Sequence, residues 1–77
     1  MNYFITTFQV IINGESTVGK TGDKTTDKTP NPNRLKEKII AHYRKDYPLP
    51  NTVAVHIVKS DLVSQDIYNQ QESSLIF

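Results

Sequence analysis

The dipeptide Asn13-Gly14 is the feature that most constrains how this chain of 77 residues folds. It directly follows the segment Tyr3–Ile12, YFITTFQVII, whose aromatic and β-branched residues predict a strand. Asn and Gly both tolerate the positive φ that the two central positions of a type I′ turn require. We therefore expect a hairpin in which Glu15–Thr21 returns antiparallel to the first strand.

A two-residue turn also fixes the register of this hairpin, with Val10 opposite Thr17 and Phe8 opposite Gly19. Alternation along the first strand places one set of apolar residues on a single face, namely Phe4, Phe8, Val10 and Ile12. The other face is more mixed, with Tyr3, Ile5, Thr7, Gln9 and Ile11. The returning strand has Val18 as its only apolar residue and contains Gly19, so we expect it at an edge of the sheet.

The segment Asn33–Asp46, NRLKEKIIAHYRKD, is the one stretch with helical periodicity. At about 100° per residue, one face collects the apolar residues Leu35, Ile39, Ile40 and Tyr43. The opposite face collects the basic residues Arg34, Lys38 and Lys45. Asn31 followed by Pro32, or Asn33 itself, supplies an N-cap, and Pro48 ends the helix.

The segment Thr52–Lys59, TVAVHIVK, predicts a further strand, and its apolar character on both faces indicates a central position in the sheet. Ser60 or Ser64 then caps a short helix. The main helix is a right-handed crossover if this strand runs parallel to the first, and an antiparallel arrangement is the alternative. The sequence thus predicts an α+β fold with a small sheet of about three strands (β-hairpin, crossover helix, central strand, short C-terminal helix). The main helix packs on one face of this sheet.

Residues 1–77 are expected to form a single domain with two less ordered parts. Residues 22–33, GDKTTDKTPNPN, contain no apolar side chain whose burial would offset the entropy of ordering them, so they predict a flexible loop. Residues 70–77 are polar until the last three, and they predict a mobile tail. The alternative is that the apolar end of this tail docks on the core or on another chain.

The charge is unevenly distributed, although the net charge is only +1. The segment Lys20–Lys45 carries eight basic and three acidic residues, whereas Asp46–Phe77 carries one basic and four acidic residues. Such a dipolar molecule can steer a partner or pair with a second copy. No apolar segment reaches the length of about 20 residues that a membrane helix needs, and no signal peptide is evident, so we expect a cytoplasmic protein without a membrane partner.

The segment Gly14–Thr21 reads GESTVGKT and fits the P-loop pattern G-x-x-x-x-G-K-[ST]. A working P-loop needs a helix that begins at the Lys-Thr pair, because the helix N-terminus faces the phosphates. The residues that follow, GDKTTD, start no stable helix, and Asn13-Gly14 favours a hairpin instead. We therefore expect neither nucleotide binding nor nucleotide hydrolysis.

Other catalytic or metal-binding patterns are not apparent in the sequence. His42 and His56 have no partner at metal-ligand spacing, and the chain has no cysteine. The serines lie outside any nucleophile-elbow context, and the acidic residues are dispersed. We expect a protein that is not an enzyme and that holds no cofactor and no metal.

Two binding functions remain. The leading hypothesis is protein binding, to another protein or to a second copy, because edge strands accept added strands. Its candidate residues are Glu15, Thr17, Lys20, Thr21, Leu75, Ile76 and Phe77. The alternative is nucleic-acid binding by the basic helix face and the Lys-rich loop, through Lys24, Lys28, Arg34, Lys38 and Lys45. Against it, the isoelectric point of about 8.0 lies below the range typical of nucleic-acid-binding domains.

Four segments carry a resemblance to a known group of proteins: Phe4-Ile5-Thr6, Asn13-Gly14, Val53–Val58 and Ser64–Asn69. In this layout the chain resembles short, uncharacterised proteins encoded by bacteriophages and mobile elements. The resemblance implies no particular activity and transfers no functional residues. It implies an accessory factor that binds a host protein in the host-cell cytoplasm.

Overall fold

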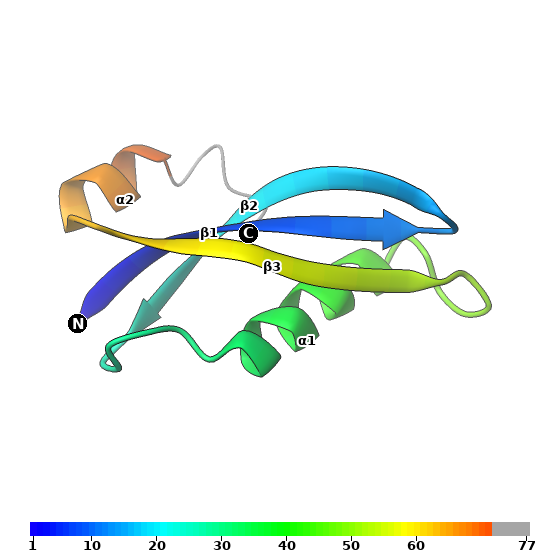
Figure 1. Cartoon of the computed structure of the whole chain (residues 1–77), viewed down its shortest axis with the longest axis horizontal. Coiled ribbons are helices and arrows are strands. Elements are labelled where there is room, and N and C mark those ends of the chain that lie inside the picture. The colour runs from blue at the N-terminus through cyan, green and yellow to red at the C-terminus, as the bar shows by residue number, and fades with distance from the viewer. Residues whose placement is uncertain (72–77) are drawn as a thin grey trace.

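The computed structural model describes residues 1–71, and its elements follow the order β1-β2-α1-β3-α2 (Figure 1). Strands β1 (Asn2–Ile12), β2 (Glu15–Thr25) and β3 (Val53–Val63) form one antiparallel sheet in the order β2-β1-β3. Helix α1 (Pro32–Arg44) lies on one face, and α2 (Gln65–Gln71) lies on the other, at one end of the sheet. The predicted α+β fold, with a three-stranded sheet and one main helix on one face, is confirmed.

The hairpin of β1 and β2 has the predicted turn and register. Asn13 and Gly14 have φ values of 52° and 87°, as a type I′ turn requires. Val10 pairs with Thr17 and Phe8 with Gly19, and the same register continues to the pair Asn2–Thr25. The hairpin is therefore longer than the sequence indicated, because β2 pairs with every residue of β1.

The prediction that the third strand is central was wrong, because β1 is the central strand and β3 forms an edge. β3 runs antiparallel to β1, which was the alternative arrangement, and α1 connects β2 to β3, which run parallel to each other on either side of β1. The apolar pattern of β3 was misleading because several of its apolar residues are exposed, including Val58 and Leu62. β1 instead has buried residues on both faces, with Phe8 on the α1 side and Ile5 on the opposite side.

Helix α1 begins at a strong cap and buries the predicted face. The Asn31 side-chain oxygen accepts hydrogen bonds from the backbone N–H groups of Asn33 and Arg34, at 3.0 and 3.3 Å. Leu35 and Ile39 are fully buried, and Ile39 lies in the same core as Phe8, Val10 and Val55. Ile40 and Tyr43 pack against this core, with the Tyr43 ring edge-on to Phe8 at a centroid distance of 6.4 Å.

The connection between α1 and β3 is tied to the hairpin turn. The Asn13 side chain accepts a hydrogen bond from the Thr52 backbone N–H at 3.1 Å and donates one to the Asn51 side chain at 3.0 Å. The Arg44 guanidinium donates to the backbone carbonyls of Tyr47 and Asn51. The Leu49–Pro50 peptide bond in this connection is cis. Asn13 thus joins the tip of the hairpin to the start of β3.

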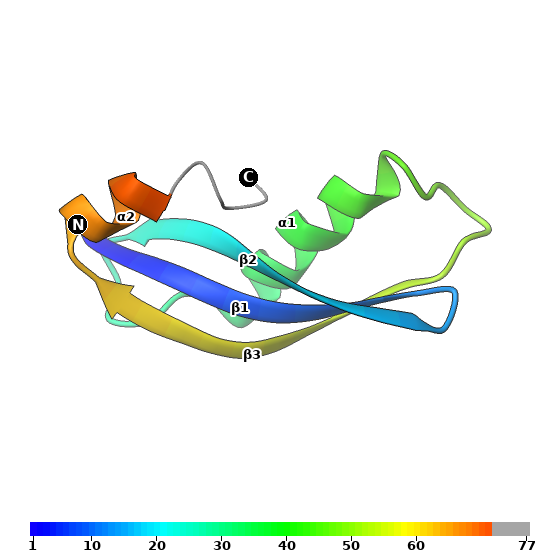
Figure 2. The same cartoon turned by 90° about the horizontal axis from the view of Figure 1, so that it is seen from above.

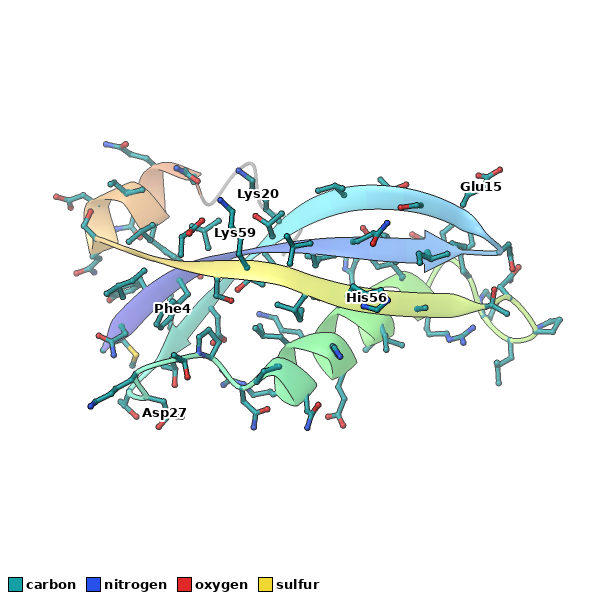
Figure 3. All side chains as sticks on the ribbon, in the orientation of Figure 1. Phe4, Glu15, Lys20, Asp27, His56 and Lys59 are labelled. Carbon is teal, nitrogen blue, oxygen red and sulfur yellow. The ribbon has the colours of Figure 1, made fainter. Side chains whose placement is uncertain are left out.

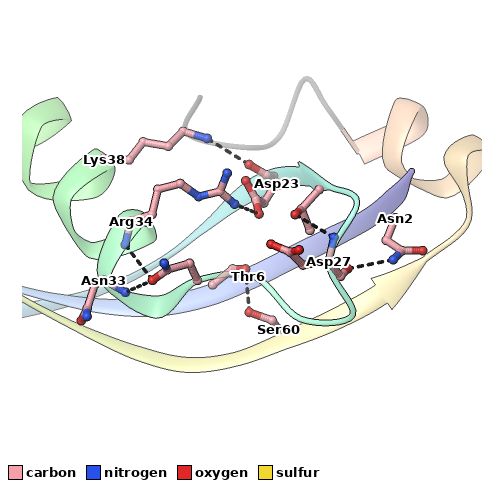
Figure 4. Close-up of polar contacts among 11 residues, drawn as sticks. Asn2, Thr6, Asp23, Asp27, Asn33, Arg34, Lys38 and Ser60 are labelled. Carbon is pink, nitrogen blue, oxygen red and sulfur yellow. Dashed lines mark hydrogen bonds and ion pairs between the residues drawn. The ribbon is translucent and has the colours of Figure 1, made fainter.

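The predicted flexible loop at residues 22–33 was wrong at both ends. Residues 22–25 belong to β2, and α1 begins at Pro32. Asp23 and Thr25 are buried although they are polar, because buried polar groups are tolerated when they form hydrogen bonds. Asp23 pairs with Arg34, and in the adjacent row of the sheet the Thr6 and Ser60 hydroxyls lie 2.8 Å apart (Figure 4). No buried side-chain polar atom within residues 1–71 lacks a hydrogen-bond partner.

Helix α2 packs on the sheet face opposite α1 (Figure 2). Ser64 caps it, since the Ser64 hydroxyl accepts from the backbone N–H of Ile67 at 3.2 Å. Tyr68 is buried, with its ring centroid 5.3 Å from that of Tyr3 on β1. Gln70 and Gln71, part of the predicted mobile tail, belong to α2, whereas residues 72–77 of that tail lie outside the described residues.

Candidate functional site

Strand β2 lies at one edge of the sheet, so no strand within residues 1–71 pairs with its outer side. In a hairpin with a two-residue turn, the residues that exchange hydrogen bonds with the neighbouring strand alternate from the turn onward. Ser16, Val18 and Lys20 therefore direct their backbone N–H and C=O groups away from β1. All four residues of Glu15–Val18 are exposed. This half of β2 is consequently available to an added strand.

A shallow cleft adjoins this free edge, near the hairpin turn. Its lining includes Ile12 and Asn13 of the hairpin, Glu15 and Thr17 of β2, and Tyr47 from the segment after α1. Tyr47 is partly exposed and contributes an aromatic residue to the lining, whereas Glu15 contributes a carboxylate. The cleft therefore suits a side chain with an apolar stem and a positively charged end.

The structure brings together three of the residues predicted to bind a protein. Glu15, Thr17 and Lys20 are all exposed on β2, although the strand register places Lys20 on the sheet face opposite the other two. The assignment of Thr21 was wrong, because Thr21 has 0% of its surface exposed and pairs with Thr6 in the centre of the sheet. Leu75, Ile76 and Phe77 lie outside the described residues.

Two of the three residues on the predicted basic face of α1, Arg34 and Lys38, contact β2, although both remain exposed. The Arg34 guanidinium forms an ion pair with the buried Asp23 carboxylate at 2.5 Å (Figure 4). The Lys38 ammonium donates to the Gly22 backbone carbonyl at 3.1 Å. Both long side chains reach sideways because β2 extends along this flank of the helix. Burial lowers the pKa of Lys38, Asp23 acts against this shift, and Arg34 acts with it.

The remaining candidates for nucleic-acid binding lie in separate places. Lys24 lies on the sheet face opposite α1, with its ammonium 5.5 Å from the centroid of the Tyr68 ring. Lys28 lies in the connection between β2 and α1, and Lys45 directly follows α1. The five predicted residues therefore do not form one continuous surface.

The sheet face opposite α1, which we call the outer face, gathers a different set of lysines. Lys20 and Lys59 both pair with Thr7, so they flank it in one row across the three strands (Figure 3). Lys24 lies on the same face of β2 as Lys20. Sequence reasoning missed Lys59 because it assigned β3 to the centre of the sheet. The alternation of side chains along β3, together with the pairing of β3 with β1, places Lys59 on the outer face.

The P-loop-like segment has the shape of a hairpin. Gly14–Thr21 forms the second turn residue and the first part of β2, and the strand continues to Thr25 where a P-loop needs a helix. His42 packs edge-on against Tyr43, whereas His56 is exposed on the outer face beside Gln9. Within residues 1–71, no group of three or more His, Cys, Asp or Glu side chains is placed to hold a metal ion.

The chain matches no protein-family model, and comparisons with curated proteins and with solved structures give no significant match. In the described part of the chain, no helix is both long enough and apolar enough to cross a membrane. The features of the molecule that bear on its function are therefore the free edge of β2, the adjacent cleft and the outer face.

Proposed function

We propose that this chain is a non-enzymatic protein-binding module that accepts an extended segment of another protein along β2. The observation that carries this proposal is the unpaired edge at Glu15–Val18 with a cleft directly beside it. A strand added to an edge gains main-chain hydrogen bonds, and its alternate side chains enter pockets on one face. This part of the edge contains no Pro and no bulge, two of the features that protect edge strands from added strands.

The two parts of this surface contribute differently to binding. Each added main-chain hydrogen bond contributes about 1 kcal/mol net and is insensitive to the partner's sequence. Selectivity therefore comes from the cleft, where the Tyr47 ring and the Glu15 carboxylate favour a Lys or Arg side chain of the partner. The resemblance to phage-encoded accessory proteins supports a host cytoplasmic protein as the partner.

Site-specific photo-crosslinking in living cells tests the proposal. A benzophenone amino acid at Val18 should give one adduct of discrete mass, whereas the same group at Ala41, exposed on α1, should give none. Lys20→Pro removes an outward-facing N–H and should abolish the adduct, while Lys20→Ala keeps that N–H and should preserve it. Adducts of similar yield from both positions, or an adduct that persists in the proline variant, would contradict binding along β2.

Nucleic-acid binding is a second candidate, favoured by the outer face. Lys20, Lys24 and Lys59 lie on that face, with Asp61 as the one acidic residue of the three strands there. Three phosphate contacts would give log K a slope of about −3 against log salt. Amide NMR spectra recorded with a mixed-sequence DNA duplex should then show shifts at Lys20 and Lys59 that fade at physiological salt. Shifts at Lys28 and Lys45 would instead assign binding to the α1 side, and an unchanged spectrum would exclude duplex DNA.

A further inference from the structure

Strand β3 is the second free edge of the sheet, and its exposed residues differ in kind from those of β2. It pairs with β1 on one side, and no strand within residues 1–71 pairs with the other. Val58 and Leu62 are 60% and 66% exposed. β3 has no proline or glycine along its eleven residues. An edge strand that exposes apolar residues can pair with a strand of another chain.

The exposed half of β3 is self-complementary in charge and in hydrophobicity. The segment Ile57–Val63 reads IVKSDLV, with Ser60 at its centre. Lys59 precedes Ser60 and Asp61 follows it, and each end of the segment has two apolar residues. Two copies related by a two-fold axis must form an interface in which residue i faces residue j and residue j faces residue i. An antiparallel pair centred on Ser60 therefore places Lys59 opposite Asp61 of the second copy, twice, and Val58 opposite the second copy's Leu62.

Neighbouring two-fold registers are much less favourable. A pair centred on Asp61 brings two carboxylates together, and a pair centred on Lys59 brings two ammonium groups together. Like charges directly opposite each other destabilise paired strands, whereas opposite charges and apolar pairs stabilise them. Charge thus selects Ser60 as the centre.

The structure presents these residues in the orientation that the pairing needs. Lys59 and Asp61 both lie on the outer face, more than half exposed, with their charged atoms 3.4 Å apart. Ser60 lies on the opposite face and is held by its contact with Thr6. Val58 has no counterpart on β1, because Thr7 pairs with Lys59 and Phe8 with Ile57. This β-bulge leaves Val58 exposed at the edge.

We propose that two copies of this chain associate through β3, antiparallel about Ser60, to form a continuous six-stranded sheet. The two β2 strands would then form the outer edges of the combined sheet, and the outer faces of the two copies would be contiguous. The proposal goes beyond the proposed function because it uses the opposite edge. Either interface can therefore fail without the other.

Charge reversal tests both the interface and its register. Lys59→Asp alone creates two Asp–Asp pairs, and Asp61→Lys alone creates two Lys–Lys pairs. Each single variant should raise the dimer dissociation constant at least about tenfold, measured by sedimentation equilibrium, since like charges replace two favourable pairs. The double variant Lys59→Asp/Asp61→Lys should restore dimerisation. Lys45→Asp, a charge reversal away from β3, should leave it unchanged.

A mixture of the two single variants gives the sharpest result. One chain then carries two aspartates and the other two lysines at positions 59 and 61, so the mixture should form a heterodimer although each variant alone is a folded monomer. Circular dichroism of each variant confirms folding. A wild-type chain that stays monomeric at millimolar concentration, or single variants that dimerise as well as the wild type, would overturn the proposal.

Discussion

Strands β2 and β3 both flank β1 over most of its length, yet the more polar of the two is the more buried. β2 buries Thr21, Gly22, Asp23 and Thr25, whereas Val55 is the only buried residue of β3. Hydrophobicity alone would reverse this order. The comparison shows that burial in this sheet is decided by the cover that other elements provide and by hydrogen bonds that satisfy the polar groups.

Two long side chains of α1 contact the end of β2. Arg34 and Lys38 extend from α1 to the Asp23 carboxylate and to the Gly22 carbonyl, and so connect that end of β2 to the helix. β3 has no equivalent cover at its C-terminal half, where Leu62 remains exposed on the α1 side. On β2, the polar residue Asp23 is thus buried through a specific contact, whereas on β3 the apolar residue Leu62 stays exposed at a free edge.

The variant with the largest expected effect, Ile39→Asp, tests whether the sheet and α1 depend on one shared hydrophobic core. Ile39→Asp places an unpaired charge at a fully buried position that contacts the residues of β1 and β3, and the cost exceeds the few kcal/mol that so small a domain has. The variant should be unfolded by far-UV circular dichroism and by NMR dispersion. Ala41→Asp, on the exposed side of α1, should remain folded. A folded Ile39→Asp variant would contradict the assignment of the buried face of α1.

The next effect tests the ion pair that allows β2 to be buried. Arg34→Ala leaves the Asp23 carboxylate buried without its cation and should reduce the free energy of unfolding by about 1–3 kcal/mol in urea denaturation. Lys38→Ala should cost less, because it leaves a neutral carbonyl behind. Amide exchange at residues 23–25 should accelerate in the first variant. Equal losses in the two variants would show that the ion pair is not what holds this half of β2.

A variant with a smaller expected effect tests how Asn13 connects the β1–β2 turn to the residues that precede β3. Asn13→Ala loses both tolerance of positive φ and the side-chain hydrogen bonds to residues 51 and 52, and should cost about 1–2 kcal/mol. Asn13→Gly restores the backbone freedom without the hydrogen bonds, so its loss measured by thermal unfolding should be smaller. If both variants lose the same stability, the contacts to residues 51 and 52 account for the whole effect.

The smallest effect concerns alkaline pH. Burial, with a further contribution from Tyr47, raises the pKa of Tyr43 above its ordinary value of 10.0. The unfolded chain therefore releases this proton first, so the stability that Tyr43 contributes is fully present below pH 10 and is lost as the pH rises above it. Tyr43→Phe should lessen the fall in the free energy of unfolding between neutral and strongly alkaline pH. An unchanged pH dependence would contradict this assignment.

The features that could be predicted from the sequence are those that local chemistry determines. Asn13-Gly14 determined the turn and the register, and helical periodicity identified Leu35 and Ile39 as buried. The end of β2 could have been found by extending the same register to the start of β1. It was missed because Asp23 is buried only through a contact with Arg34 on another element.

The position of β3 and the composition of the outer face depend on contacts between distant segments. Apolar residues on both faces predicted a central strand, but in this fold they mark an exposed edge. The row of Lys20, Thr7 and Lys59 likewise arises only when three separate segments pair. Local patterns identify the elements, and the arrangement of those elements decides which surface each one presents.

The central position of β1 has a consequence for the synthesis of the chain. Of the three strands, the central β1 is made before both of its neighbours, and β3 is made after α1 is complete. Until β3 emerges from the ribosome, one whole side of β1 exposes unpaired backbone groups beside Phe8 and Val10. Such an edge can pair with other newly made chains. We therefore expect the yield of folded protein to depend on how quickly β3 joins β1 as well as on the stability of the finished sheet.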